Sequence, residues 1–329
     1  MSIYICIISN VIYTLYIFII LATYSHRRTG ATRWKYTYAD IVYITDATST
    51  IEVTSYALEL PIESVTLPSK MLNQYQEAKN RLRKDPSIIT SHTVFIVDQS
   101  GSMRQSDVGG HKTRSRGVYY SLAEEFTVSQ LSPVTSGLLE GPNISYTDVC
   151  TLIEMRDDAT VVFEMEPITW ILYNTFVELS KANGSRSHGN YLPSFREAFR
   201  QLHAIDHSHC ALALYVLTDG KPSDQDVDFR NTLFHLVRSF CNHFGKRLDL
   251  TTVGFGSQTS QFTLLEELQV IARDAGCRNS TFVTTLNMST LGNSLSKLSE
   301  TTSQMRTLLS RLNNNQLSGS TPRVKRVDI

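Results

Sequence analysis

From residue 91 onward, short apolar segments alternate with longer segments of helical periodicity. HTVFIV and CALALYVLTDG are examples of the first kind, and residues 114–131 and 227–245 are examples of the second. A strand that is apolar on both faces must be covered on both faces, as in a parallel sheet between two layers of helices. The alternation therefore predicts an α/β fold of the Rossmann-like type, with a doubly wound, mostly parallel sheet and helices on both faces.

One pair of apolar segments has a different connection. TDVCTLIEM and ATVVFEMEP are joined only by the turn-like RDD, which is too short for a crossover helix. Two strands joined by such a short turn form an antiparallel hairpin. We therefore expect one antiparallel edge strand. Before the sheet, residues 69–84 have the pattern of a charged amphipathic helix that Asp85-Pro86 ends.

The N-terminal run from Ile3 to Tyr24 carries no charge and is long enough to cross a bilayer. The basic residues 26–28 follow it at once, and the positive-inside rule would place the bulk of the chain in the cytoplasm. Residues 3–24 are therefore a candidate single-pass membrane anchor. Because the run contains Ser9, Asn10 and Thr14, a poorly inserted segment is the alternative.

Composition excludes several partner classes. Lys plus Arg and Asp plus Glu number 31 each, so no global basic field predicts nucleic-acid binding. The five cysteines are scattered without a CxxC pair, which indicates buried free thiols and an intracellular setting. No small-molecule substrate is predicted. The expected divisions are a hydrophobic segment 1–28, an N-terminal extension 29–89, the α/β domain 90–305 and a polar, disordered tail 306–329.

Small oxygen-bearing side chains follow the first core strand, in the sequence DQSGS. Asp98, Ser100 and Ser102 alternate there, and Asp219 follows a later apolar strand. In open α/β sheets, ligands bind beyond the carboxyl ends of the strands, so these four residues should meet on one rim. Hydroxyl and carboxylate oxygens are hard ligands, and such a small set suits Mg²⁺ or Mn²⁺ with a coordination position left open.

The D-x-S-x-S motif, the strand-end LTDGKPSD stretch and the order of elements over roughly residues 90–300 resemble the von Willebrand factor type A (VWA) family. Its metal-ion-dependent adhesion site uses D-x-S-x-S, a threonine on a second loop and an aspartate on a third. The resemblance implies direct ligation by Ser100 and Ser102, and ligation by Asp98 and Asp219 directly or through water. It further implies a protein partner that offers a Glu or Asp, and movement of the last helix coupled to the ion.

The second loop departs from the family pattern. It reads SRSHGNYLPSF, without the expected threonine. Asn190 falls at the threonine position, since Leu192 then takes the following apolar position, and an Asn oxygen can ligate a hard cation. Ser187 is the other candidate for this role.

The stretches RKDPSIITSHTVFIVDQSGSMRQSDV, EMRDD, HGNYLP and VGFG resemble VWA domains of alpha-kinase-associated proteins of protists and fungi. That resemblance implies an intracellular setting. No kinase motif is present, and the QSGS context of Ser100 is not that of a hydrolase nucleophile, so no enzyme activity is predicted. The expected function is metal-dependent protein binding. The alternative is a regulatory scaffold whose metal loop is structural.

Other charges near the predicted rim are expected to be solvated. They are the basic stretch KTRSR at 112–116 and the aspartates Asp107, Asp224, Asp226 and Asp228. Charged residues in loops usually face solvent, although these aspartates could also tune the affinity for an ion and the basic stretch could contact an acidic partner.

Overall fold

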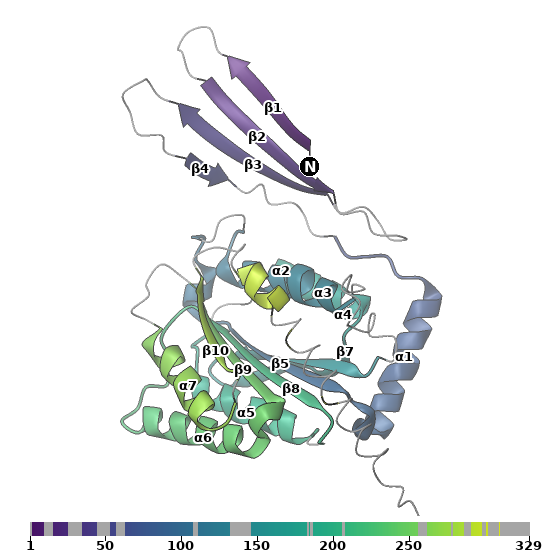
Figure 1. Cartoon of the computed structure of the whole chain (residues 1–329), viewed down its shortest axis with the longest axis vertical. Helices are drawn as coiled ribbons and strands as arrows, with labels where there is room; N and C mark the ends of the chain where they lie inside the picture. Colours follow the sequence, from purple (N-terminus) through teal and green to yellow (C-terminus); the bar gives the residue numbers. More distant parts are fainter. Residues whose placement is uncertain are drawn as a thin grey trace, which may run out of the picture.

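A computed structural model defines the fold. It describes residues 2–9, 16–25, 35–44, 53–56, 63–107, 111–131, 146–182, 184, 187–205, 208–255, 262–277, 279–285, 291–297, 301 and 309. These residues include a six-stranded sheet with flanking helices and a separate four-stranded sheet at the N-terminus (Figure 1). The predicted site lies in the six-stranded part of the molecule.

The six-stranded sheet has the order β10-β9-β8-β5-β6-β7. All neighbouring strands are parallel except β7, which is antiparallel to β6 at the edge. This arrangement confirms the predicted fold class and the predicted hairpin. The strands are β5 (Ser91–Asp98), β6 (Asp148–Met155), β7 (Ala159–Pro167), β8 (Ala211–Thr218), β9 (Leu248–Phe255) and β10 (Thr281–Thr285).

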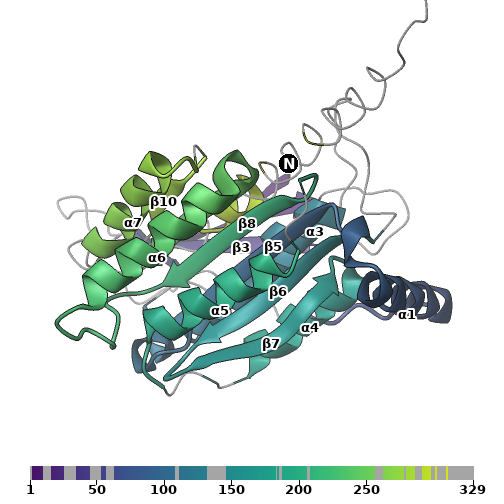
Figure 2. The same ribbon diagram turned by 90° about the horizontal axis from the view of Figure 1, so that it is seen from below.

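Helices cover both faces of the sheet, in two layers that Figures 1 and 2 show from two directions. One layer holds α2 (Arg114–Ser121), α3 (Val128–Leu131) and α4 (Trp170–Lys181), with a π-helix at Leu122–Thr127 between α2 and α3. The other layer holds α5 (Tyr191–His203), α6 (Phe229–Phe244) and α7 (Thr263–Asp274).

Strand β5 shows why both layers form. Val94 and Ile96 point into the cluster shared with α5, α6 and α7. Phe95 and Val97 point into the cluster shared with α2 and α4. All four are completely buried, as expected where alternate side chains of a strand face two different helical layers.

Helix α1 (Ser69–Lys84) has the bounds predicted for the charged helix, and it contacts the edge strand β7. Leu82 is buried in the core, and Lys79 Nζ lies 2.6 Å from Glu166 Oε2 on β7. A helix placed beside an edge strand protects it from pairing with another chain. The division between an extension ending at 89 and a domain beginning at 90 stays a prediction.

The described residues of the N-terminal run, 3–9 and 16–24, are strands, and a membrane anchor at residues 3–24 stays a prediction. They belong to β1 (Ser2–Ser9) and β2 (Tyr16–Ser25), which pair antiparallel in one sheet with β3 (Lys35–Ile44) and β4 (Val53–Tyr56). The run is rich in Ile, Tyr and Phe, and β-branched and aromatic residues favour strands. No helix in the part of the chain that the structure describes is long and apolar enough to cross a membrane.

At the other end of the chain, residues 291–297 are helical. Leu291 and Leu295 are buried against the α2–α4 side of the sheet. Apart from residue 309, the predicted tail 306–329 lies outside the described residues. The expectation of buried free thiols is confirmed for four of the cysteines, namely Cys150, Cys210, Cys241 and Cys277.

Candidate metal site at the sheet rim

The candidate site lies where the strand order reverses. After β5 the chain moves to β6 and β7 on one side, and it then returns to β8 on the other side of β5. The carboxyl ends of β5 and β8 are therefore adjacent, with Val97 opposite Leu217, and Asp98 and Asp219 follow directly. Such a switch point leaves a crevice in which open α/β sheets bind ligands. Both aspartates are almost completely buried.

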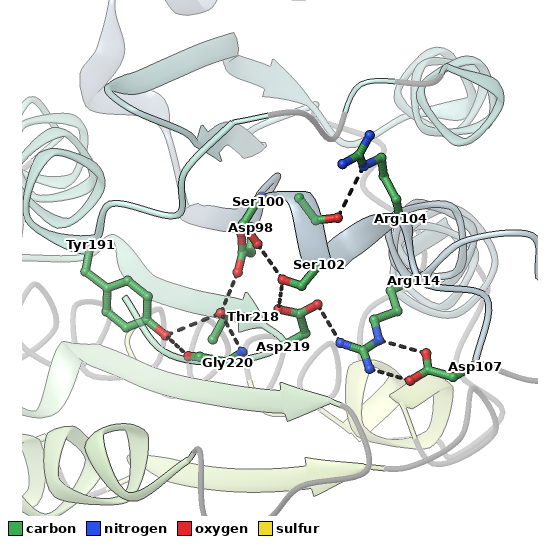
Figure 3. Close-up of polar contacts among 11 residues, drawn as sticks. Asp98, Ser100, Ser102, Arg104, Asp107, Arg114, Tyr191, Thr218, Asp219 and Gly220 are labelled. Atoms are coloured by element: carbon green, nitrogen blue, oxygen red, sulfur yellow. Dashed lines mark hydrogen bonds and ion pairs between the residues drawn. The ribbon is translucent and has the colours of Figure 1, made fainter. Parts of the chain in front are cut away.

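Four of the predicted ligands are joined by short polar contacts (Figure 3). The Ser100 and Ser102 hydroxyl oxygens lie 2.9 Å apart, and Ser102 Oγ donates to Asp219 Oδ1 at 2.8 Å. The backbone N–H of Ser100 donates to Asp98 Oδ1 at 2.7 Å. The structure therefore brings together Asp98, Ser100, Ser102 and Asp219 as the sequence predicted.

Thr218 is a member of the site that the sequence analysis missed. Its hydroxyl donates to Asp98 Oδ2 at 2.7 Å, and it also accepts a 3.3 Å hydrogen bond from the Tyr191 hydroxyl. The single proton of the Tyr191 hydroxyl is shared with the carbonyl of Gly220, whose oxygen lies closer, at 2.9 Å. The available signal was the position of Thr218 directly before Asp219 on a strand parallel to β5.

Burial raises the pKa of Asp98 to about 6, with the charge of Asp219 as the second cause. The hydrogen bonds from Ser100 and Thr218 act in the opposite direction, since they stabilise the carboxylate. Two carboxylates this close in a buried rim repel each other. A cation placed between them would relieve that repulsion.

Arg114 already supplies one positive charge at the rim. Its Nη1 lies 2.7 Å from Asp219 Oδ2, and its Nε donates to Asp107 Oδ1 at 2.7 Å (Figure 3). Thr113 caps α2 by accepting from the N–H of Arg116 at 3.1 Å, which fixes Arg114 as the first helical residue. The expectation that this basic stretch is solvated is wrong for Arg114, because its side chain is buried between the two aspartates.

The two second-loop candidates for the threonine role both contact Asp157. Asn190 Nδ2 donates to the carbonyl of Asp157 at 2.8 Å. Ser187 Oγ accepts from the N–H of Asp157 at 3.0 Å. Both candidates for the threonine role are therefore engaged with the turn between β6 and β7. Ligation by Asn190 or by Ser187 stays a prediction.

Gly189 brings the second loop close to the carboxylate of Asp98. A Cβ atom at Gly189 would lie 3.0 Å from Asp98 Oδ1 and 3.4 Å from Ser100 Cβ. The N–H of Gly101 donates to the carbonyl of Ser187 at 3.1 Å, so the two loops are joined by backbone. A glycine permits this close approach because it has no side chain.

Asp224 has a structural role that its loop position did not predict. Its two carboxylate oxygens accept from the N–H groups of Tyr191 and Leu192 at 3.0 and 2.8 Å, at the start of α5. The N–H groups at a helix start have no partner within the helix, and they favour a negative charge. Asp224 is therefore a cap for α5, whereas Asp226 and Asp228 are exposed as expected.

The rim fits a small divalent cation by its donor chemistry and spacing. Mg²⁺ binds oxygens at about 2.0–2.1 Å in an octahedron, so adjacent ligands lie about 2.9 Å apart, whereas the longer bonds of Ca²⁺ require wider spacing. The contacts of 2.8 and 2.9 Å among Ser100, Ser102 and Asp219 match the smaller ion. The same distances are ordinary hydrogen-bond lengths, because the side chains can contact one another without an ion. The spacing is therefore compatible with the ion and does not require it. Among the described residues, no group of three or more His, Cys, Asp or Glu could hold a metal.

No family model and no curated protein matches the sequence. Among solved structures, the PilB minor pilin from Streptococcus sanguinis matches 92% of this chain and 80% of its own, with 10% identity and a TM-score of 0.51. This likeness shows a shared fold. The SpRpn10 VWA domain matches 64% of this chain and 94% of its own, with 14% identity and a TM-score of 0.45. A von Willebrand factor type A protein from Catenulispora acidiphila matches 81% of this chain and 45% of its own, with 14% identity and a TM-score of 0.46.

Proposed function

We propose that residues 90–305 form a VWA-type protein-interaction module that binds Mg²⁺ or Mn²⁺ at the rim. The observation that carries this proposal is the run of oxygens from Ser100 through Ser102 to Asp219 at the switch point of the sheet, with contacts of 2.9 and 2.8 Å. Asp98 completes the set from the end of β5. The sheet is doubly wound, as the resemblance to the VWA family implied, and it has the antiparallel edge that the short RDD turn predicted.

When bound, the ion supplies a positive centre with an open coordination position. Ser100, Ser102 and Asp219 hold it with hard oxygens, and Asp98 supplies a second negative charge beside them. The open position accepts a Glu or Asp side chain of a protein partner. We propose no catalytic role and no nucleic-acid partner. A cytoplasm-facing location is part of the proposal and rests on the basic residues 26–28 and the scattered cysteines. Kinship to alpha-kinase-associated VWA proteins is a further part and rests on the sequence resemblance alone.

A structural role for the rim is the second candidate, and one observation favours it. The buried carboxylates already have protein partners, since Thr218 donates to Asp98 and Arg114 pairs with Asp219. A rim satisfied in this way can order the loops without binding a partner. In that case, a change at Asp98 lowers stability and leaves partner recognition unchanged.

Titration calorimetry with Mg²⁺ and Mn²⁺ on the full chain tests the proposal, with Asp98→Asn as the disabling variant. Asp249→Asn is a matched control. Asp249 is also buried with a pKa raised to about 6, but it is the second residue of β9 and so lies at the opposite end of the parallel sheet. We expect saturable binding by the parent, at least about tenfold weaker binding by Asp98→Asn because a charge-assisted ligand is lost, and no change for Asp249→Asn.

Two further measurements test whether Asn190 is a ligand and whether the bound ion accepts an acidic side chain. Asn190→Ala tests the predicted ligand of the second loop. A loss of ion affinity as large as that of Asp98→Asn would establish Asn190 as a ligand, and an affinity within about twofold of the parent would show that it is not one. A peptide with one Glu should bind only with the ion present, and its Gln counterpart should not bind. A folded parent that binds neither ion would contradict the metal-dependent function.

A further inference from the structure

We propose that Arg114 sets the affinity of the rim for its divalent ion, and this inference rests on the proposed metal-dependent function. The side chain is almost fully buried and is not part of the D-x-S-x-S motif. It adds a positive charge to a place where the ion must also bring one. The result is a site that holds a bare ion weakly and holds an ion together with an acidic partner group more tightly.

The geometry begins with the two oxygens of Asp219. Oδ1 accepts from Ser102 at 2.8 Å and faces the predicted ligands, whereas Oδ2 lies 2.7 Å from Nη1 of Arg114. One carboxylate therefore separates the guanidinium from the ion position. Only 7% of the Arg114 side chain is exposed, so water and salt screen its charge poorly.

Arg114 has two effects on an ion, and they differ in sign. Its hydrogen bond orients Asp219, which favours binding, and its charge repels a dication, which opposes binding. Asp219 would stay oriented without Arg114, because Ser102 also contacts its Oδ1. The charge repulsion between Arg114 and the ion would be lost entirely without Arg114. We therefore expect the charge to dominate, and removal of the charge should tighten the binding of the ion.

Asp107 offsets part of this repulsion. It pairs with Arg114, but 40% of its side chain is exposed, against 2% for Asp219. Its negative charge is better screened than the guanidinium and lies on the far side of it from the ion position. Loss of the Asp107 charge should therefore leave Arg114 more strongly repulsive and weaken ion binding.

The consequence for recognition follows from charge. A carboxylate from a partner cancels one of the two charges of the ion, so the repulsion by Arg114 falls by about half when the partner is bound. Arg114 thus penalises the bare ion more than the ion–carboxylate pair. Linkage then requires that the ion and the acidic partner strengthen each other's binding.

The test measures Mn²⁺ and Mg²⁺ binding by calorimetry on the full chain, with Arg114→Gln and Asp107→Asn. Gln keeps a donor for Asp219 and removes the charge. Arg230→Gln is the matched control, because Arg230 pairs with Glu267 at the exposed surface of α6 and α7. We expect about tenfold tighter ion binding for Arg114→Gln, several-fold weaker binding for Asp107→Asn and no change for Arg230→Gln.

A glutamate-containing peptide adds a second readout. Arg114→Gln should increase the affinity for the ion less when the peptide is present than when it is absent. If Arg114→Gln binds the ion no more tightly than the parent does, while the parent and Arg230→Gln bind it normally, the proposed role of Arg114 is wrong. The proposed metal-binding function would be unaffected by that result. Absence of binding in every variant would overturn both. If Arg114→Gln fails to fold, unchanged or tighter binding by Asp107→Asn overturns the inference alone.

Discussion

Asp98 and Asp107 are nine residues apart, yet the structure shifts their pKa values in opposite directions. Burial and the charge of Asp219 raise the pKa of Asp98 to about 6. Hydrogen bonds from Arg114 lower the pKa of Asp107. The side chains are chemically identical, so the difference comes from their surroundings. At the scale of single residues, the rim therefore combines a buried carboxylate that accepts from neutral hydrogen-bond donors with a more exposed one that is paired with a cation.

His92 gives a prediction at the same scale. It is fully buried on β5, its Nε2 lies 2.8 Å from Thr151 Oγ1, and burial lowers its pKa to about 3. The unfolded chain takes up this proton near pH 6.5, and the folded protein does so only near pH 3. The stability from His92 is therefore complete above pH 6.5 and is lost as the pH falls towards 3.

Between pH 6.5 and pH 5, the parent should lose about 2 kcal/mol of unfolding free energy through this residue. His92→Gln keeps a hydrogen-bonding partner for Thr151 and cannot titrate, so it should lose about that much less. Urea unfolding at the two pH values measures both losses. Equal losses in the parent and the variant would show that His92 does not control this part of the acid response.

At the scale of elements, the start of α5 is held from outside the helix. Asp224 accepts from the N–H groups of Tyr191 and Leu192, and the N–H of Ser223 donates to the carbonyl of Gly189 at 3.0 Å. The loop after β8 therefore fixes the second loop against Asp98. An aspartate from a distant segment thus takes the role that a residue at the helix boundary usually has.

Asp224→Ala should lower the unfolding free energy by about 1–2 kcal/mol, because two N–H groups lose their acceptor and the helix start loses a negative charge. Asp226→Ala is the control in the same loop, and we expect a change within about 0.5 kcal/mol for this exposed residue. Denaturant unfolding of the two variants compares them. A similar, small loss in both would mean that water replaces the cap without cost.

At the scale of the whole molecule, α1 belongs with the sheet that follows it. Ala78 and Leu82 are buried, and Lys79 and Tyr75 both contact Glu166 on β7. These contacts place residues before 90 in the same packed structure as the predicted site. Without α1, the core would lose two apolar side chains and β7 would be an uncovered edge.

A chain that begins at residue 90 should therefore be less stable than one that begins at residue 63, by about 2–4 kcal/mol from the lost apolar burial. It should also aggregate more readily through β7. Unfolding free energies and light scattering of the two chains measure these effects. Equal stability would show that the α/β domain folds independently from residue 90.

Much of the site could be predicted because its members follow strands. Asp98 and Asp219 end apolar segments, and the carboxyl ends of parallel strands share one rim. Arg114 and Asp224 lie in polar loops whose letters do not distinguish a solvated charge from a paired one. Their partners are 105 and 33 residues away, at Asp219 and Tyr191, so only the folded chain defines the contacts.

The sequence by itself determined the architecture, because an apolar strand must be covered on both faces and a short turn permits only an antiparallel hairpin. It also determined the oxygen-rich rim, through the spacing of DQSGS and the aspartate after β8. Only the tertiary structure decided which side chains at the rim are paired with one another. Burial brings Arg114 onto Asp219 and turns Asn190 towards Asp157. Contacts of this kind depend on where loops meet in space, which local sequence patterns do not specify.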